Sequence, residues 1–501
     1  MVDQSSRLHG RPKARLPRGF QDSTGNTLGL YEQLIGKLAD VYASYGFERL
    51  TTPCVEFADA LGKFLPDQTR PNEGVFSFQD DDSQWLVLRY DLTAPLARYV
   101  AENYDTLAFP YRRFQTGPVF RDEKPGPGRF REFIQFDADT VGTSAMAADA
   151  EFCMLVADAL EAFGLARGDY VVKVNNRKVL NGILELIGVP TGPSGEVRRL
   201  GILRAMDKLD RLGMDGVGQL LGKGRRDESG DFTPGAELAA KDTDRVLAFL
   251  NAGGSKRVSV CASLAQLVKG SAIGEEGAAE LLEIDANLTA AGFSFDRVRI
   301  DPSVVRGLAY YTGPVFEAEL TFEIPGEDGR PIRFGSVGGG GRYDDLVERF
   351  LGKKVPATGV SIGVSRLAAA LKTQGLLSAK SATGPVVVLA LDRDQLLGYQ
   401  AMVSELRANG IRAELYLGDG GMRAQLRYAD KRAASVVVIE GEDERARGEV
   451  TLKDMALGAE LSSAIKSREE WAKGEASQIS VKRAGLVRNM KEILARTGRN
   501  R

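Results

Sequence analysis

Arginines and glutamates gather in one short stretch of this chain that has the pattern of a β-hairpin. Alternating and β-branched residues predict strands over 111–120 and 133–141, and prolines and glycines between them predict the turn. The stretch holds three arginines, Arg121, Arg129 and Arg131, beside two glutamates, Glu123 and Glu132. Guanidinium groups grip phosphate and carboxylate oxygens through paired hydrogen bonds. Any one of these arginines is best read as a solvated hairpin residue, but the ordered set favours an anion-binding site.

The histidines and cysteines of the chain limit the chemistry that such a site can perform. His9 is the only histidine, which excludes a Ser-His-Asp triad and a histidine-bearing zinc site. Cys54, Cys153 and Cys261 are far apart among apolar neighbours, as buried thiols of a reducing compartment are, and no protein ligands for a metal are identifiable. Carboxylates, arginines and tyrosines remain, and they suit a phosphoryl-centred reaction driven by positioning and electrostatics.

Composition indicates a globular chain of two or three domains. The 501 residues are 43% hydrophobic and 27% charged, and no apolar run approaches the roughly 18 residues of a membrane span. The polar start, Met1 to Arg18, lacks the apolar core of a secretory signal. A net charge of −2 argues against a histone-like nucleic-acid binder. The stretch from Ser480 is nevertheless basic, which fits an RNA-binding terminus and a frayed solubilising tail about equally.

Periodicity predicts the elements that must position the charged hairpin. Apolar spacing predicts helices over 28–45 and 145–164, and strands over 48–52, 85–90 and 170–174. From Asn175 to about Arg297 the chain is rich in alanine, leucine and charge, which indicates a mainly helical insertion. Strands are predicted again over 299–301, 315–322 and 333–337, and a short strand turns into a helix within 358–367.

The C-terminal part reads as a separate small domain. Small and polar residues over 374–384 predict a linker. Beyond it, strands are predicted over 386–391, 412–417 and 435–439, with helices over 396–409 and 422–432 between them. This alternation predicts a small, mostly parallel α/β domain.

Several segments together resemble one enzyme family. Phe120-Arg121-Asp122-Glu123, followed by Gly128-Arg129-Phe130-Arg131-Glu132-Phe133 and Gln135, resembles motif 2 of the class II aminoacyl-tRNA synthetases. Arg306-Gly307-Leu308-Ala309-Tyr310-Tyr311-Thr312-Gly313 resembles the signature of the histidyl-tRNA synthetases. The glycine-rich run Gly338 to Asp344 resembles the strand that floors their pocket.

Two more segments extend the resemblance from Leu16 to about Asp454. Residues 28–53 resemble motif 1, which class II enzymes use at their dimer interface, and 358–367 resembles motif 3. The implied fold class is α+β: an antiparallel class II sheet flanked by helices, a mainly helical insertion and a C-terminal α/β anticodon-binding domain. The implied domains are a polar leader (1–15), the catalytic domain (16–174 and 298–373), the insertion (175–297), a linker (374–384) and the anticodon-binding domain with its basic tail (385–501).

The implied activity is that of a histidine–tRNA ligase. Such an enzyme joins histidine to ATP as histidyl-adenylate, releases pyrophosphate, and transfers histidine to the 3′ end of tRNA-His. Arg121 and Arg306 are implied as catalytic. The implied ATP-binding residues are Arg121, Glu123, Arg129, Phe133 and Arg366. The implied histidine-binding residues are Asp91, Thr93, Gln135, Asp139, Tyr310, Tyr311 and Tyr343. Asp139 follows Gln135 by four residues, which puts both on one face of a strand.

The resemblance also implies the surroundings of the reaction. Mg²⁺ would neutralise pyrophosphate, and the partners would be L-histidine, ATP, tRNA-His and a second copy of the chain. A cytoplasmic location with neither membrane nor DNA as a partner is expected. Two residues depart from the family pattern: Ala309 stands where an acid is common, and Ser365 where motif 3 often has a glutamate.

Three other functions compete with this interpretation. A catalytically silent paralogue, the regulatory subunit of an ATP phosphoribosyltransferase, loses motif 2 arginines and the C-terminal domain, and both are present here. A class II synthetase for another amino acid is disfavoured by the 306–313 segment together with Asp139. A pure RNA-binding module would not need a complete nucleotide site.

Overall fold

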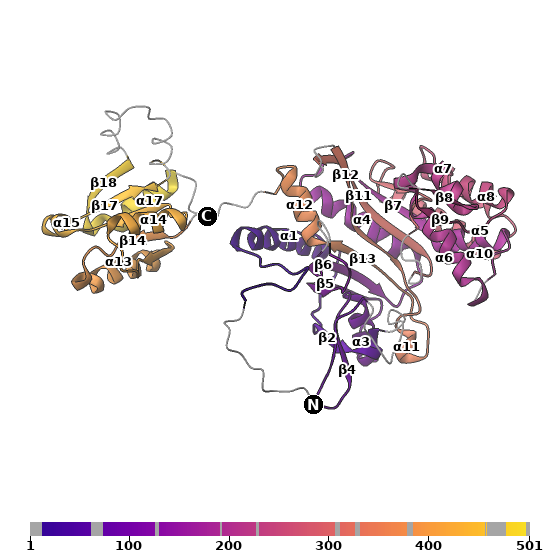
Figure 1. Ribbon diagram of the computed structural model, residues 1–501, viewed down its shortest axis with the longest axis horizontal. Helices are drawn as coiled ribbons and strands as arrows, with labels where there is room; N and C mark the ends of the chain where they lie inside the picture. Colours follow the sequence, from indigo (N-terminus) through magenta and orange to yellow (C-terminus); the bar gives the residue numbers. More distant parts are fainter. Residues whose placement is uncertain are drawn as a thin grey trace. The chain divides into compact units, whose positions relative to one another are not determined.

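The computed structural model describes residues 13–61, 74–125, 130–190, 193–226, 230–305, 311–325, 331–377, 384–455, 457 and 477–496. The chain divides into two compact units, Met1–Ser378 and Ala379–Arg501 (Figure 1). Among the helices in those segments, none combines the length and the apolar composition that a bilayer crossing requires.

A mixed sheet of eight strands is the centre of the first unit. Its strand order is β1-β5-β6-β13-β12-β11-β7-β10. The strands span Glu48–Arg49 (β1), Tyr111–Phe120 (β5), Glu132–Val141 (β6), Ala357–Gly363 (β13), Pro331–Arg342 (β12), Pro314–Pro325 (β11), Tyr170–Asn176 (β7) and Val298–Ile300 (β10). The pairings from β5 to β7 are antiparallel, as predicted, and only the outer strands β1 and β10 pair in parallel.

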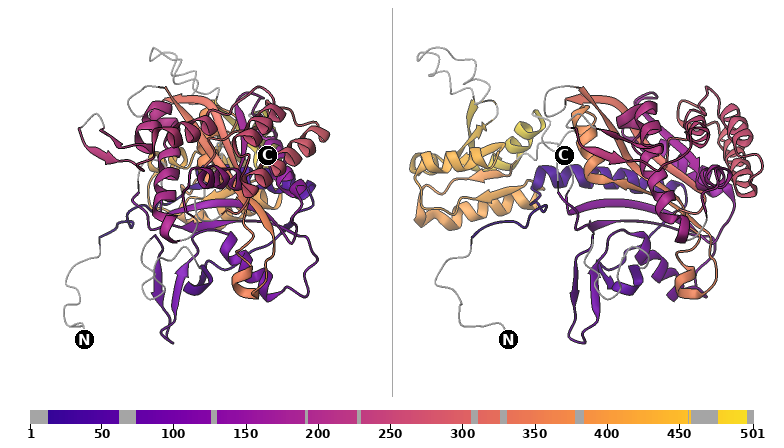
Figure 2. Two further views of the ribbon diagram at one scale, coloured as in Figure 1. Left: turned by 90° about the vertical axis from the view of Figure 1, so that its right-hand side faces the viewer. Right: turned by 45° about the vertical axis from the view of Figure 1, so that its right-hand side comes forward.

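Three helices cover one face of this sheet: α1 (Gly25–Ser44), α4 (Met146–Ala162) and α12 (Val364–Thr373). Figures 1 and 2 show α1 lying along β5 and β6. Tyr42 of α1 meets the ring of Phe136 edge-on, with centroids 4.9 Å apart, and Phe136 stacks on Phe114. Because side chains alternate along a strand, the odd-numbered residues of β6, such as Gln135 and Asp137, lie on the opposite face.

The segment between β7 and β10 is mainly helical. Its helices are α5 (Arg177–Leu186), α6 (Pro193–Met206), α7 (Leu209–Leu221), α8 (Ala240–Leu250), α9 (Arg257–Leu267) and α10 (Ala272–Ala290). The helix α10 packs on α5, α9 and α4. A short hairpin of β8 (Gly224–Arg226) and β9 (Phe232–Pro234) was not predicted.

Smaller elements complete the first unit. A three-stranded sheet has the order β2-β4-β3, with β2 at Val55–Phe57, β4 at Trp85–Leu88 and β3 at Ser77–Gln79. Three helices accompany this sheet: α2 (Ala58–Leu61), α3 (Thr93–Glu102) and α11 (Glu348–Leu351). The helix α2 contacts β2, β4 and α3, and α11 contacts α3.

The second unit is built on a five-stranded sheet of order β15-β14-β16-β17-β18. Its strands are β14 (Val386–Val388), β15 (Ala413–Leu415), β16 (Val436–Ile439), β17 (Glu449–Asp454) and β18 (Gln478–Lys482). Its helices are α13 (Leu396–Ala408), α14 (Met422–Lys431), α15 (Glu442–Arg447) and α17 (Leu486–Arg496). The three strands that the sequence predicts, β14, β15 and β16, pair in parallel as expected. The strands β17 and β18 were not predicted, and they extend the sheet in antiparallel pairings.

The basic C-terminal stretch is ordered through Arg496, which corrects the frayed-tail alternative. In α17, the buried residues Leu486, Met490, Ile493 and Leu494 recur at helical spacing and join the core of the second unit. Arg488 and Lys491 lie on the exposed face of the same helix.

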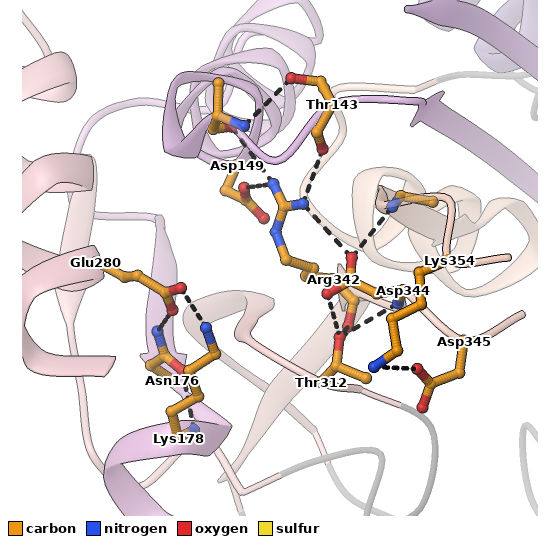
Figure 3. Close-up of polar contacts among 12 residues, drawn as sticks. Thr143, Asp149, Asn176, Lys178, Glu280, Thr312, Arg342, Asp344, Asp345 and Lys354 are labelled. Atoms are coloured by element: carbon orange, nitrogen blue, oxygen red, sulfur yellow. Dashed lines mark hydrogen bonds and ion pairs between the residues drawn. The ribbon is translucent and has the colours of Figure 1, made fainter. Parts of the chain in front are cut away.

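A buried ion pair ties the end of β12 to α4 (Figure 3). The Arg342 guanidinium pairs with the Asp149 carboxylate, and the two side chains are 3% and 0% exposed. Arg342 Nη1 also donates to the carbonyl of Thr143 at 2.9 Å. The backbone of Arg342 accepts from the Thr312 N–H at 2.8 Å, and the Thr312 hydroxyl donates to Asp344 at 3.0 Å. Thr312 follows Tyr311, and Arg342 and Asp344 flank Tyr343. The network therefore fixes the backbone beside both tyrosines.

We therefore expect Asp149→Asn to lower the free energy of unfolding of the first unit by about 3–5 kcal/mol, because it leaves a buried guanidinium uncompensated. Asp345 is a matched control: it pairs with Lys354 at 3.8 Å, and both side chains are exposed. Asp345→Asn should change stability by less than about 1 kcal/mol. Urea unfolding of both variants measures the difference, and equal effects would contradict the anchoring role of Asp149.

Candidate active site

A hollow of about 470 Å³ opens on the sheet face that the three helices leave uncovered. It contains six of the residues predicted from the sequence: Asp91, Thr93, Arg121, Gln135, Tyr311 and Arg366. Four polar residues that were not predicted also line it: Tyr90, Asp137, Ser336 and Ser361. Residues from α3, β5–β6, β12 and β13 thus meet at one place, although up to 276 positions separate Tyr90 from Arg366.

Glycines make the hollow possible. A Cβ on Gly359 would lie 2.0 Å from Asp139 Oδ1, and a Cβ on Gly341 would lie 2.9 Å from the Tyr311 ring. A Cβ on Gly340 would lie 2.0 Å from the Gly359 carbonyl oxygen. Side chains at these positions would collide with the site or its backbone. The glycine-rich run therefore forms a bare floor on which a ligand can approach the main chain.

Arg121 presents its charge between two aromatic rings. Its Cζ lies 4.4 Å from the ring centre of Tyr90 and 5.1 Å from that of Phe133. The Tyr90 hydroxyl donates to Glu123 Oε1 at 3.1 Å, and burial raises the pKa of Tyr90. No carboxylate within the described segments forms an ion pair with Arg121, so its guanidinium is available to an anion. Arg366 Nη2 donates to the Phe334 carbonyl at 3.1 Å.

Acceptors gather at the neighbouring part of the hollow. Asp91 Oδ1 accepts from the backbone N–H groups of Thr93 at 3.1 Å and Ala94 at 2.9 Å, which begins α3 and fixes the carboxylate. Gln135 Nε2 donates to Ser361 Oγ at 2.7 Å. Gln135 Oε1 is buried and has no hydrogen-bond partner among the described residues. Fixed acceptors of this kind suit an ammonium group.

Asp139 and Tyr343 lie beneath the hollow rather than in its lining. Asp139 Oδ2 is 2.8 Å from Arg113 Nη2, and these side chains are 3% and 0% exposed. Asp139 Oδ1 accepts from the Tyr343 hydroxyl. Burial raises the pKa of Asp139, while Arg113 and Tyr343 act in the opposite direction. Both oxygens of Asp139 therefore have protein partners.

Comparison with known proteins identifies the family to which this site belongs. A family model described as histidyl-tRNA synthetase matches residues 19–367, and one described as an anticodon binding domain matches residues 385–475. A curated histidine–tRNA ligase of Brucella ovis is 58% identical over 100% of this chain and 99% of its own length. One of Methylocella silvestris is 59% identical over 97% of this chain and 98% of its own.

The chain belongs to the histidyl-tRNA synthetase family. A solved histidyl-tRNA synthetase from Nostoc sp. PCC 7120 matches 96% of this chain and 100% of its own, with a TM-score of 0.68 and 27% identity. A Bacillus halodurans structure titled as an ATP phosphoribosyltransferase regulatory subunit/histidyl-tRNA synthetase has a TM-score of 0.61 over 83% of this chain and 97% of its own, at 22% identity. At that identity the likeness concerns the fold alone. The curated relatives at 58% and 59% identity are named histidine–tRNA ligases, so they do not favour the alternative of a phosphoribosyltransferase regulatory subunit.

Some residues implied by the synthetase resemblance cannot be placed in the hollow. Arg129, Arg306 and Tyr310 lie outside the described residues. Glu123 and Phe133 contact Tyr90 and Arg121 respectively but are not part of the lining.

Asp137 is the acidic residue of this synthetase site that the sequence reasoning missed. It stands midway between Gln135 and Asp139, so the same two-residue strand period pointed to it. Burial, and next the charge of Asp139, raise the pKa of Asp137 to about 7. Burial also raises the pKa of Asp149 to about 6.

This shift predicts how the stability of the synthetase changes with pH. The pKa of Asp137 is higher in the folded chain than the ordinary aspartate value of 3.8, so the folded state holds the proton more tightly. The contribution of this protonated carboxyl group to the free energy of unfolding is fully present below the pKa of the unfolded chain. It is lost as the pH rises toward about 7. Asp137→Asn, which stays neutral, should therefore gain stability relative to the parent between pH 5 and pH 8, by about 1 kcal/mol or more. Melting temperatures of both proteins across this range test it. If the melting temperatures of the two proteins changed with pH in parallel, the raised pKa of Asp137 would be contradicted. The titration of Asp149 is common to both proteins and cancels in the comparison.

Proposed function

We propose that this chain acts as a histidine–tRNA ligase. The observation that carries the proposal is one hollow in which Arg121 and Arg366 meet the acceptors Asp91 and Gln135, in a chain 58% identical to a curated histidine–tRNA ligase over its full length. The activation of an amino acid by ATP requires cationic groups that bind the phosphates. It also requires hydrogen-bond acceptors nearby that bind the ammonium group of the amino acid.

The activation step needs alignment and charge stabilisation more than proton transfer. An oxygen of the histidine carboxylate attacks the α-phosphorus of ATP, the bond to the β-phosphate oxygen breaks, and pyrophosphate leaves. Arg121 would bridge the carboxylate and the α-phosphate, holding nucleophile and electrophile in line. Its position between Tyr90 and Phe133 supports this role, because both rings restrict the guanidinium. Asp91, Thr93 and Gln135 would hold the ammonium.

Other roles in the site are proposed on the family resemblance. Arg306 would place a second cation on the α-phosphate, Arg366 and Arg129 would bind the nucleotide, and Glu123 and Phe133 would meet the adenine. Tyr310, Tyr311, Asp139 and Tyr343 would belong to the histidine pocket. Mg²⁺ bound to the phosphates would offset the charge of pyrophosphate, with ATP rather than a protein cluster as its main ligand. No group of metal-ligating side chains is found in the described parts of the chain.

The activity is tested by amino-acid-dependent exchange of pyrophosphate into ATP. We expect exchange with histidine and none above background with the other standard amino acids, since a polar site rejects substrates that leave its groups unpaired. Exchange with a different amino acid would contradict the histidine assignment. A protein without exchange activity, but with the fold intact, would favour the regulatory alternative.

The C-terminal unit is proposed to bind the anticodon region of tRNA-His. It has a core of its own, in which Val386, Tyr399 and Leu486 pack with residues from all parts of the unit. The family match over residues 385–475 supports the role. The boundaries proposed from the sequence, 298–373 for the end of the catalytic domain and 385–501 for the anticodon-binding domain, are compatible with the two compact units. A cytoplasmic location and the lack of a DNA partner remain predictions.

A chain ending near Gly384 should still make histidyl-adenylate from histidine and ATP. It should charge tRNA poorly, mainly through weaker tRNA binding, because the bases of an anticodon loop are read by a separate domain. Single-turnover adenylation and tRNA-dependent aminoacylation measure the two activities separately. Normal aminoacylation by the shortened chain would show that the C-terminal unit does not recognise the tRNA.

We further propose that the chain forms a homodimer through the region of motif 1 and the strands that follow it. Exposed apolar side chains lie on the small sheet next in the chain: Val55 is 38%, Phe57 49% and Phe78 45% exposed. Phe57 and Phe78 flank Leu86 in the same row of that sheet. Such a row favours contact with another protein surface, and a two-fold interface presents the same patch twice.

Light scattering at micromolar concentration should therefore find dimers. Replacing Phe57 and Phe78 together by serine should weaken the dimer by about tenfold or more, because the row loses its apolar area. Val197 on α6 is 82% exposed, and Val197→Ser is the control that should leave assembly unchanged. A parent protein that is monomeric with full activity would contradict the proposal.

A further inference from the structure

Tyr90 lines the hollow beside Arg121, and the backbone explains why these two residues are neighbours. The carbonyl of Arg89 accepts from the N–H of Phe120 at 3.0 Å, so the segment after β4 runs next to the end of β5. The Arg89 side chain is 2% exposed and donates to the carbonyl of Pro118 on β5 at 2.8 Å. This buried anchor holds Tyr90 at a fixed point beside the charged hairpin.

The ring of Tyr90 lies against the guanidinium group of Arg121. The ring centre is 4.4 Å from Arg121 Cζ, which is closer than the 5.1 Å to the ring centre of Phe133. Arg121 Nε donates to the Tyr90 carbonyl at 3.4 Å. The described residues provide no hydrogen-bond partner for its two terminal nitrogens, so these can meet a carboxylate and a phosphate. A ring orients a guanidinium group without neutralising its charge, as a carboxylate would.

The hydroxyl of Tyr90 reaches a second residue that the family resemblance assigns to the nucleotide. It donates to Glu123 Oε1 at 3.1 Å, and Glu123 is exposed, so the bond restrains a side chain that otherwise samples several rotamers. Burial raises the pKa of Tyr90, and Glu123 raises it as well, while Arg121 lowers it. The hydroxyl therefore keeps its proton at neutral pH and acts as a donor. The second oxygen of Glu123 can accept from the amino group of adenine.

Other contacts hold the hairpin itself. Arg131 pairs with Asp122 at 3.0 Å and donates to the Glu123 carbonyl at 3.0 Å. The N–H of Asp122 donates to the Gly74 carbonyl at 3.0 Å. The Tyr90 ring also packs on a small apolar cluster, which consists of Ala58, Val75, Val87 and Ala94. For the fold alone, this position needs an apolar side chain but neither a hydroxyl nor an aromatic ring.

We propose that Tyr90 is a positioning residue of the activation step with two separable parts: its ring orients Arg121 toward the α-phosphate, and its hydroxyl orients Glu123 toward the adenine amino group. This inference rests on the proposed function. The two parts should affect different kinetic constants. Charge shifts on the α-phosphate during the reaction, so the ring should act on kcat. Adenine is bound equally before and during the reaction, so the hydroxyl should act on the KM for ATP.

Tyr90→Phe tests the hydroxyl, because it keeps the ring and its packing. In pyrophosphate exchange, its KM for ATP should rise by about threefold or more, while kcat stays within about twofold of the parent. The preference for ATP over purine riboside triphosphate, which lacks the 6-amino group, should fall by the same factor. When Glu123→Ala is already present, Tyr90→Phe should add nothing to these changes, because the two residues act as one pair.

Tyr90→Leu and Tyr90→Met test the ring, because both keep an apolar side chain on the cluster. Single-turnover adenylation at saturating ATP should slow by about fivefold or more in both variants, and it should stay within about twofold of the parent in Tyr90→Phe. Melting temperatures show that the compared proteins are folded, and two side chains of different shape separate the loss of the ring from a packing defect.

Tyr104 is the matched control. Its ring centre lies 3.8 Å from Lys353 Nζ, so it also carries a cation, but it is not part of the lining of the hollow. Tyr104→Phe and Tyr104→Leu should leave kcat and the KM for ATP within about twofold of the parent.

Three results would overturn the proposal. An ATP preference that Tyr90→Phe leaves unchanged, or that falls further in the Glu123→Ala background, would remove the role of the hydroxyl. Normal single-turnover rates in Tyr90→Leu and Tyr90→Met would remove the role of the ring. A loss confined to the KM for histidine would place Tyr90 in the amino-acid pocket and contradict both roles. A parent protein without histidine-dependent exchange refutes the proposed function instead, whatever the variants do.

Discussion

The site depends on keeping a hollow open on the face of a sheet. Neighbouring strands are only about 4.8 Å apart, and every ordinary residue on such a face fills the space above it with a side chain. The chain solves this with glycines in register, Gly359 and Gly341 in one row and Gly340 beside them. Their missing Cβ atoms leave room for Asp139, Tyr311 and the backbone itself. The cost is a stretch of strand without side-chain packing, and the opposite face, with Tyr42, Phe114 and Phe136 under α1, supplies the packing that this face lacks.

The charges of the hollow are divided into two regions. Arg121 and Arg366 line one part of the hollow, where Arg121 has the rings of Tyr90 and Phe133 rather than carboxylates around its guanidinium group. Asp91, Asp137 and Asp139 form the other region, where Arg113 pairs with Asp139 and Arg89 is close enough to interact with Asp137. An amino acid has a carboxylate and a cationic amine, and it would lie with the carboxylate toward the arginines and the amine toward the acids. Because neither region is neutral by itself, each is complementary to one end of the substrate.

Much of the fold was predictable because its signals are local. The strand predicted over 111–120 is β5 to the residue, and the helix predicted over 28–45 is α1 within a few residues at its start, because apolar periodicity dominates in both. The errors arose where pairing between distant segments decides the outcome. The strands β17 and β18 join the second sheet antiparallel across a long connection, and α17 looked like a basic tail because its four buried residues are spaced among charges.

In the site, too, local sequence signals were predictable and contacts between distant segments were not. The residue types of the hairpin and the glycine run carried the family resemblance, and they led to Arg121, Gln135 and Tyr311, which line the hollow. What the sequence could not tell was which acid pairs with Arg113 and Tyr343. Asp137 and Asp139 look equivalent in a strand of period two, and only this pairing of Asp139 distinguishes them. That pairing depends on β5, which lies next to β6, and on the end of β12, which lies on the other side of β6 beyond β13.

The functional groups of the hollow are also sources of instability in the free protein. Asp137 is a buried carboxylate whose nearest charged neighbour in the strand is another carboxylate, and Gln135 Oε1 is a buried acceptor without a donor in the described structure. Each would be improved, for folding alone, by an apolar residue. The buried pair of Arg342 and Asp149 lies at the end of the glycine-rich strand and fixes the chain on both sides of Tyr343. Because this anchor lies outside the hollow, the strand can remain without side chains where the substrate would bind and still keep its register. Stability and binding are thus supplied by different residues of one strand, and a ligand that donates to the acceptors of the hollow would stabilise the fold as it binds.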